Sequence, residues 1–260
     1  MSPENIKSKL DNLYNLYNKR MYVHPDPLEF LYLYKDIRDR EIVGLIASSL
    51  AYGRVAQILK SVSFVLDIMH PSPYLFIMDS TYKTICRAFE GFKHRFADGD
   101  QLAALLLGAR KVISRFGSLN ECFVKGMSRD DETVIPAMTF FAGHLIAGEN
   151  NPGHLVPLPE KGSACKRMNL FLRWMVRKDK VDPGGWEKVP LSKLIVPLDT
   201  HMHKISLALG LTRQKQANMR TALEITSCFK QYVPDDPVKY DFVLTRLGIR
   251  DDMDMDLILD

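Results

Sequence analysis

The sequence contains few cysteines, and the four that it has are scattered over 260 residues without a CxxC pair: Cys86, Cys122, Cys165 and Cys228. Zinc ribbons and iron–sulfur sites need closely spaced ligands, so we expect neither a metal nor another cofactor. Disulfides are rare in the reducing cytoplasm, and scattered cysteines are typical of proteins located there. The cysteine pattern therefore predicts a cytoplasmic protein.

Long apolar runs are also absent. No uncharged apolar stretch approaches the ~18 residues that a membrane span needs. The N-terminus reads Met-Ser-Pro-Glu-Asn and lacks the basic and then apolar pattern of a signal peptide. The hydrophobic fraction of 46% and the charged fraction of 25% are those of an ordinary globular chain. We expect a soluble protein that does not contact membranes.

A large excess of one charge is missing, because 35 basic and 31 acidic residues give a net charge of +4. The charges are unevenly placed, however. Residues 251–260 hold five aspartates and no base, whereas residues 161–180 hold seven basic residues and one acid. A basic segment of this kind is either the footprint of an anionic partner or a solvated helix face.

Period-two alternation and Asn-Gly or Asp-Gly turns are missing as well, so nothing in the sequence indicates strands. Apolar residues instead recur at steps of three and four, which is the spacing of amphipathic helices. Most prolines lie between these segments, where the missing backbone donor is tolerated. The sequence predicts an all-α protein with helices near residues 6–17, 42–50, 55–66, 101–116, 132–146, 216–229 and 236–247.

Two stretches rich in proline and glycine, 148–162 and 178–197, bracket a basic helix predicted over residues 163–177. Loops of this length are usually functional or flexible. Apolar side chains fall on one face of the basic helix. The opposite, polar side is formed by Lys166, Asn169, Arg173 and Arg177.

Two residues near these loops are candidates for chemistry. Lys166 lies at a helix N-terminus, where the macrodipole disfavours a cation, and such local conflicts are typical of functional sites. An ordinary surface lysine is the alternative. Asp199 follows Pro197 at the start of another helical segment, where a capping carboxylate explains it without any chemistry.

Both residues belong to motifs that resemble a known group of enzymes. The segments Leu158-Pro159…Gly162…Lys166-x-x-Asn169 and Leu198-Asp199-Thr-His201 resemble the helix-hairpin-helix base-excision DNA glycosylases, of which endonuclease III is a member. Over most of its length the chain also resembles an uncharacterised family, domain of unknown function 2400. The shared motifs are Lys-Arg-x-Asn-x-Phe-Leu-Arg-Trp-Met-Val-Arg and Pro-Leu-Asp-Thr-His.

The glycosylase resemblance implies an activity and a partner. It implies that Lys166 forms a Schiff base with an abasic site, that Asp199 is the catalytic aspartate, and that damaged or abasic DNA is the substrate. The 33 residues between them are similar to the spacing in archaeal 8-oxoguanine glycosylases, which suggests oxidised purines. The implied DNA contacts are Arg167, Asn169, Arg173, Arg177, Tyr52, Arg54 and Gln57. The implied base pocket contains Trp174, Trp186 and His201.

The resemblance also implies two helical domains. A central domain, residues 41–178, would end in the helix-hairpin-helix, and residues 1–40 together with 179–260 would form the other. Lys166 and Asp199 would then face each other across a groove that holds DNA. One glycine of the usual hairpin is replaced, since the sequence reads Leu-Pro-Glu160-Lys161-Gly162, and the cysteine motif for an iron–sulfur cluster is absent.

Two other interpretations stay open. One is a helix-hairpin-helix DNA-binding protein without catalysis. The other is a metal-dependent enzyme that uses Asp199, His201 and His203, which would need an extended segment because residues two apart diverge on a helix. The helical spacing after Pro197 argues against the metal site. The lesion, the strandedness of the substrate and the oligomeric state are left undetermined by the sequence.

Overall fold

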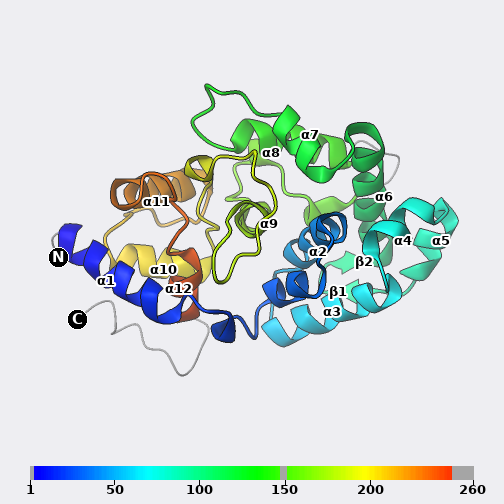
Figure 1. Cartoon of the computed structure of the whole chain (residues 1–260), viewed down its shortest axis with the longest axis horizontal. Helices are drawn as coiled ribbons and strands as arrows, with labels where there is room; N and C mark the ends of the chain where they lie inside the picture. The colour runs from blue at the N-terminus through cyan, green and yellow to red at the C-terminus, as the bar shows by residue number, and fades with distance from the viewer. Residues whose placement is uncertain (1–2, 147–150, 248–260) are drawn as a thin grey trace. The chain divides into compact units, whose positions relative to one another are not determined.

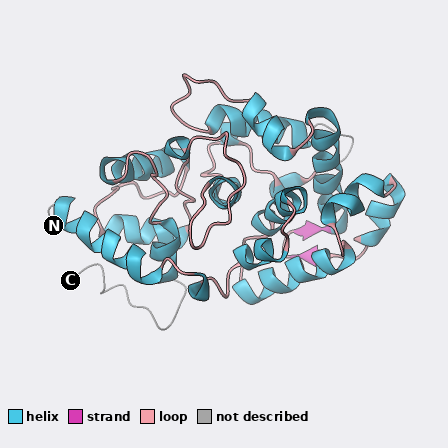
Figure 2. Cartoon of the chain, in the orientation of Figure 1, coloured by secondary structure: helices cyan, strands magenta, loops and turns pink. Residues whose placement is uncertain are grey.

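The computed structural model in Figure 1 describes residues 3–146 and 151–247. The chain divides into two compact units. Unit 1 contains residues 1–23 and 159–260, and unit 2 contains residues 24–158. Helices make up most of both units, and the described residues contain a single pair of very short strands (Figure 2), so the predicted all-α class is confirmed.

Unit 2 is built from one continuous segment of the chain. Its elements are the helices α2 (Ile37–Ser49), α3 (Val55–Ile68), α4 (Pro73–Asp79), α5 (Tyr82–Ala88), α6 (Gly99–Phe116), α7 (Leu119–Lys125) and α8 (Ile135–Ile146), the 3₁₀ turns η2 (Pro27–Leu33) and η3 (Gly153–Leu155), and the strands β1 (Lys93–His94) and β2 (Ala97–Asp98).

The core of unit 2 forms where α2 and α6 are enclosed by their neighbours. Helices α6 and α8 pack backbone against backbone at Gly108, because a Cβ there would clash with the carbonyl oxygen of Leu145. The buried carboxylate of Glu41 in α2 accepts hydrogen bonds from Leu119 N and Asn120 N at 3.2 and 3.0 Å. The first N–H groups of a helix have no partner within the helix, and here the Glu41 carboxylate accepts two of them. The buried negative charge is therefore hydrogen-bonded, and it links α2 to α7.

Unit 1 joins the N-terminal helix to the chain from residue 159 onward. Its elements are α1 (Pro3–Tyr17), α9 (Lys166–Val176), α10 (Thr200–Ala208), α11 (Met219–Tyr232) and α12 (Asp241–Leu247), with the 3₁₀ turns η1 (Arg20–Tyr22), η4 (Pro159–Lys161) and η5 (Leu191–Lys193). Asp11 of α1 accepts hydrogen bonds from Lys239 Nζ and Tyr240 Oη at 2.7 and 2.8 Å, just before α12. Lys239 and Tyr240, far from α1 in the sequence, therefore bind α1 to the rest of unit 1.

Helix α9 is the central element of unit 1, and every residue from Met168 to Val176 is buried. The loop that follows it folds back over its C-terminal end. Gly184 N and Trp186 N donate to the carbonyl oxygens of Trp174 and Met175 at 3.0 and 2.8 Å. The loop thus supplies donors to carbonyl groups that the end of a helix leaves unpaired.

The predicted helices are confirmed with shifted ends. For example, α8 begins at Ile135 rather than at 132, and residues 237–240 form a turn before α12. The short helices α4, α5 and α7 and the β1–β2 hairpin had no prediction. The boundaries of the units, after residues 23 and 158, also differ from the sequence-based division after residues 40 and 178. In the part of the chain that the structure describes, no helix has both the length and the apolar character needed to cross a membrane.

Candidate functional site

The candidate site begins at the N-terminus of α9. The described part of the segment between α8 and α9 contains the turns η3 and η4. Cys165, the N-cap of α9, has a left-handed backbone with φ 48°, which costs a non-glycine residue about 1 kcal/mol or more. Its N–H donates to Ser163 Oγ at 3.3 Å. Lys166 is the first helical residue, so this strained turn determines where its side chain begins.

Asp199 lies at the N-terminus of α10 and uses its two carboxylate oxygens differently. Oδ1 accepts hydrogen bonds from His201 N and Met202 N, both at 2.9 Å, which is the capping role predicted from the sequence. Oδ2 lies 3.9 Å from Lys166 Nζ. The cap therefore holds the carboxylate in place while the other oxygen faces the amine.

The Lys166–Asp199 pair lies at the surface of unit 1. The side chains are 30% and 22% exposed, so solvent and other molecules reach both. The sequence-based division assigned these residues to opposite sides of a groove between domains, but both belong to unit 1. A partly exposed amine beside a fixed carboxylate has the residue types of a nucleophile and its electrostatic partner.

Asn169 supports the start of α9 from inside. It is 1% exposed, and its Nδ2 donates to the carbonyl oxygen of Ala164 at 3.0 Å, across the turn that precedes Lys166. The prediction that Asn169 contacts DNA is therefore corrected, because its amide is buried and holds the chain next to Lys166. Arg167 is half-buried at the same helix start.

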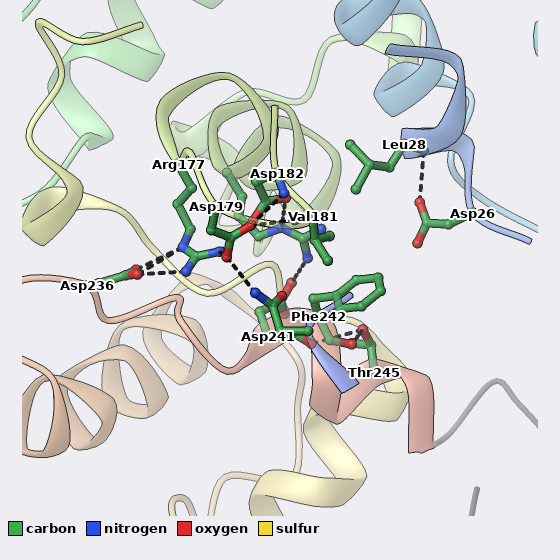
Figure 3. A network of polar contacts seen from close by, with 12 residues as sticks. Asp26, Leu28, Arg177, Asp179, Val181, Asp182, Asp236, Asp241, Phe242 and Thr245 are labelled. Atoms are coloured by element: carbon green, nitrogen blue, oxygen red, sulfur yellow. Dashed lines mark hydrogen bonds and ion pairs between the residues drawn. The ribbon is translucent and has the colours of Figure 1, made fainter. Parts of the chain in front are cut away.

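Arg177 was expected to contact phosphate but lies inside the protein, where it is 4% exposed. Figure 3 shows it among Asp179, Asp182 and Asp236. Its Nη1 donates to Asp179 at 2.8 Å and to Asp182 at 2.6 Å, and its Nη2 donates to Asp236 at 2.8 Å. Burial lowers the pKa of Arg177, but Asp182 and Asp236 raise it, so that it lies well above the ordinary value. Its charge is satisfied within the chain, and the predicted phosphate contact is corrected.

Arg173 is also buried, with an exposed fraction of 2%. Its Nε donates to Asp182 at 3.2 Å, and its Nη1 donates to Asp241. Burial raises the pKa of Asp241 to about 6; Arg173 acts to lower it, and Asp199 acts to raise it. Both arginines are therefore paired with carboxylates inside the protein, and the predicted DNA contact of Arg173 is corrected as well.

The predicted base-pocket tryptophans are also corrected. Trp174 and Trp186 are fully buried, and the Trp186 ring packs edge-on against Phe171 with 5.1 Å between ring centroids. Their bulk fills the space between α9 and its covering loop, so no face is open to a nucleobase. His201, by contrast, is half-buried on the first turn of α10, next to Asp199.

The arrangement of α10 does not favour a metal site. Helix begins at Thr200, so the side chains of Asp199, His201 and His203 do not share one face. His203 Nε2 shares a hydrogen bond with the carbonyl oxygen of Gln214 at 2.8 Å. Within residues 3–146 and 151–247, no three His, Cys, Asp or Glu side chains gather as metal ligands do.

The remaining predicted residues lie in unit 2. Tyr52 is half-buried, and its Oη donates to the carbonyl oxygen of His94 at 2.9 Å, so its hydroxyl serves the fold. Arg54 and Gln57 are exposed at the start of α3, and Gln57 Nε2 donates to Ser61 Oγ at 3.2 Å. The structure thus groups Lys166, Asp199 and His201 in one unit, and Tyr52, Arg54 and Gln57 in the other.

Sequence analysis missed the carboxylates that hold Arg173 and Arg177. Asp182, Asp236 and Asp241 are spread along the sequence, and no spacing links them to α9. One available indication was the presence of two arginines in a helix whose other residues are mostly apolar, because a buried arginine needs carboxylate partners.

A comparison with known families matches residues 26–250 to one family, which is described as "Protein of unknown function (DUF2400)". No curated protein and no solved structure matches the chain. The matched range includes the Lys166–Asp199 pair as well as Tyr52, Arg54 and Gln57, and the family description assigns a role to none of them.

Proposed function

The chain belongs to the DUF2400 family, and we propose that it is a DNA repair glycosylase with abasic-site lyase activity, with Lys166 as the nucleophile. One observation supports the proposal most directly: Lys166 Nζ lies 3.9 Å from the Asp199 oxygen that the helix cap leaves unused. The glycosylase resemblance names these same two residues. The helix-hairpin-helix assignment of the fold is part of the same proposal.

In the proposed reaction, the neutral amine of Lys166 attacks C1′ of the damaged nucleotide. The N–C1′ bond to the enzyme forms, and the glycosidic bond breaks with its electron pair passing to the base, which takes up a proton. Asp199 Oδ2 stabilises the positive charge that develops at the sugar and receives a proton from the lysine. Ring opening gives an iminium, loss of a C2′ proton expels the 3′ phosphate, and water then releases the lysine.

The proposal is tested by reducing that iminium. Incubation of the protein with abasic-site DNA and borohydride should give a covalent complex with the mass of protein plus oligonucleotide. Oxidised-purine duplexes are the first lesions to include, because of the 33-residue spacing between the two residues. If DNA binds but nothing is trapped over a broad lesion panel, the protein is a non-catalytic DNA-binding protein and the proposed activity is wrong.

Asp199→Asn should lower the single-turnover rate about 100-fold or more, because the carboxylate that faces the developing charge becomes neutral. Stability should change by no more than about 1 kcal/mol, since asparagine also caps helices well. The measurements are single-turnover cleavage of abasic DNA and urea unfolding.

Asp36→Asn is the matched control for this prediction. Asp36 caps α2 in the same way, accepting from Arg38 N at 2.9 Å, but it lies in unit 2. The control should keep the full cleavage rate. Full activity of Asp199→Asn would leave Asp199 with its capping role alone.

A further inference from the structure

The β1–β2 hairpin of unit 2 presents an aromatic side chain to solvent at its tip. The strands pair His94 with Ala97 and Lys93 with Asp98, which leaves Arg95 and Phe96 as a two-residue turn. Phe96 is 73% exposed, among the highest values for a large apolar residue in the described chain. A phenylalanine exposed to this degree gains little from burial, and its ring is accessible to a binding partner.

Arg95 occupies a backbone position that normally belongs to glycine. Its φ is 54°, and the first position of a tight hairpin turn with positive φ strongly prefers glycine. Cys165, beside Lys166, is the other described non-glycine residue with positive φ. Strain of this kind persists where the surroundings hold it and is concentrated at functional positions.

The Arg95 side chain is held over the loop that precedes α3. A Cβ at Gly53, whose φ is 97°, would lie 2.7 Å from Arg95 Cδ, so the arginine occupies space that the glycine leaves open. From this position the Arg95 guanidinium carbon lies 5.2 Å from the centroid of the Phe96 ring. A cation and an aromatic face are therefore presented together, with exposed Arg54 following Gly53 in the chain.

Part-buried polar contacts keep the hairpin in place. Tyr52 Oη donates to the His94 carbonyl oxygen, and His94 Nε2 shares a hydrogen bond with the Tyr52 carbonyl oxygen at 3.2 Å. His154 Nε2 lies 2.9 Å from Tyr52 Oη, and the His154 ring lies edge-on to Phe96, 6.4 Å away. Tyr52, predicted from the sequence as a DNA contact, thus positions the residues that reach solvent.

From this arrangement we infer that the hairpin tip binds an unpaired nucleotide of DNA. The base stacks on Phe96, and the backbone phosphate is bound by the guanidinium groups of Arg95 and Arg54. This inference rests on the proposed function in one respect only, which is that DNA is the partner.

The chemistry of the tip suits this ligand. Aromatic side chains bind unpaired bases because every base has a flat π-face, whereas a base inside a duplex is already stacked. Arginine supplies the forked donor that a phosphate oxygen pair accepts. The acid within the hairpin, Asp98, accepts a hydrogen bond from Gln101 N as the cap of α6. Its carboxylate is therefore committed to the helix.

The test measures the affinity for a short, undamaged, single-stranded oligonucleotide by fluorescence anisotropy. Phe96→Ala should weaken binding about 5- to 100-fold, and Phe96→Trp should restore it. Phe64→Ala is the control, because Phe64 is also exposed in unit 2, at 47%, but its ring stacks on Phe92. The control should change the affinity less than about twofold, because Phe64 belongs to α3 and not to the hairpin tip.

Arg95→Gly separates binding from folding. Glycine relieves the positive φ, so the melting temperature should not fall, whereas the slope of log affinity against log salt should drop by about 0.7 for each lost phosphate contact. Wild-type affinity in Phe96→Ala, or equal losses in Phe96→Ala and Phe96→Trp, would overturn the inference. Neither result affects borohydride trapping at saturating DNA, which tests the proposed function separately. A wild-type protein that binds no single-stranded DNA would overturn the inference as well.

Discussion

Lys166→Gln should abolish the borohydride-trapped complex, while the affinity for undamaged DNA changes by less than about threefold. Glutamine is nearly as long as lysine and polar, but its amide nitrogen has no available lone pair with which to attack C1′. The side chain is 30% exposed at the helix start, so the substitution leaves no buried group unpaired. The measurements are gel or mass detection of the covalent complex and anisotropy on the same oligonucleotide.

Lys161→Gln is the matched control for this variant. Lys161 belongs to the same basic segment and is exposed at the end of η4, five positions before Lys166. The Lys161→Gln variant should form as much borohydride-trapped complex as the wild type. If Lys166→Gln also traps at the wild-type level, another amine is the nucleophile and the assignment of Lys166 is wrong.

Arg177→Met should destabilise the protein by about 3–5 kcal/mol. Methionine fills most of the volume of the arginine stem, but it leaves Asp182, which is fully buried, with one guanidinium partner in place of two. It also removes the cation that lowers the pKa of Asp179 to about 2 against the raising effect of burial. Urea unfolding at neutral pH measures the loss.

Two further variants test whether the loss of stability in Arg177→Met comes from the broken ion pairs. Lys178→Met, at the adjacent exposed position, should change stability by no more than about 0.5 kcal/mol. Asp182→Asn in the Arg177→Met background should recover part of the loss, because it removes one of the two buried negative charges that Arg173 alone would then have to balance. A loss below about 1 kcal/mol in Arg177→Met would show that Arg177 is not needed to balance the buried acids.

Helix positions were predictable from the sequence because the period of apolar residues is a local property. Helix α11, predicted over residues 216–229, is found at Met219–Tyr232. The environment of α9 was not predictable in the same way. Arg173 and Arg177 read as a solvent-facing stripe, but their partners Asp241 and Asp236 lie 68 and 59 positions further along the chain. A periodicity argument cannot show whether a charge meets water or a distant carboxylate.

The candidate site was predictable in part. The resemblance of two motifs named Lys166 and Asp199, and the capping role of Asp199 followed from the residues around it. The distance between them depends on how α9 and α10 pack within unit 1, which no local pattern contains. The hairpin tip was missed because strands of two residues are too short to alternate, and because Arg95 occupies a turn position where glycine is the expected signal.

Because unit 1 is discontinuous in the sequence, the two units are completed at different times during translation. All of unit 2 lies between residues 24 and 158, so the ribosome completes it while most of unit 1 is still untranslated. Helix α1 emerges before unit 2, yet Lys239 and Tyr240, which bind its Asp11, emerge more than 220 positions later. Domains generally fold as units during translation. The apolar face of α1 therefore stays uncovered while unit 2 is synthesised, and it can be buried only when the rest of unit 1 has left the ribosome.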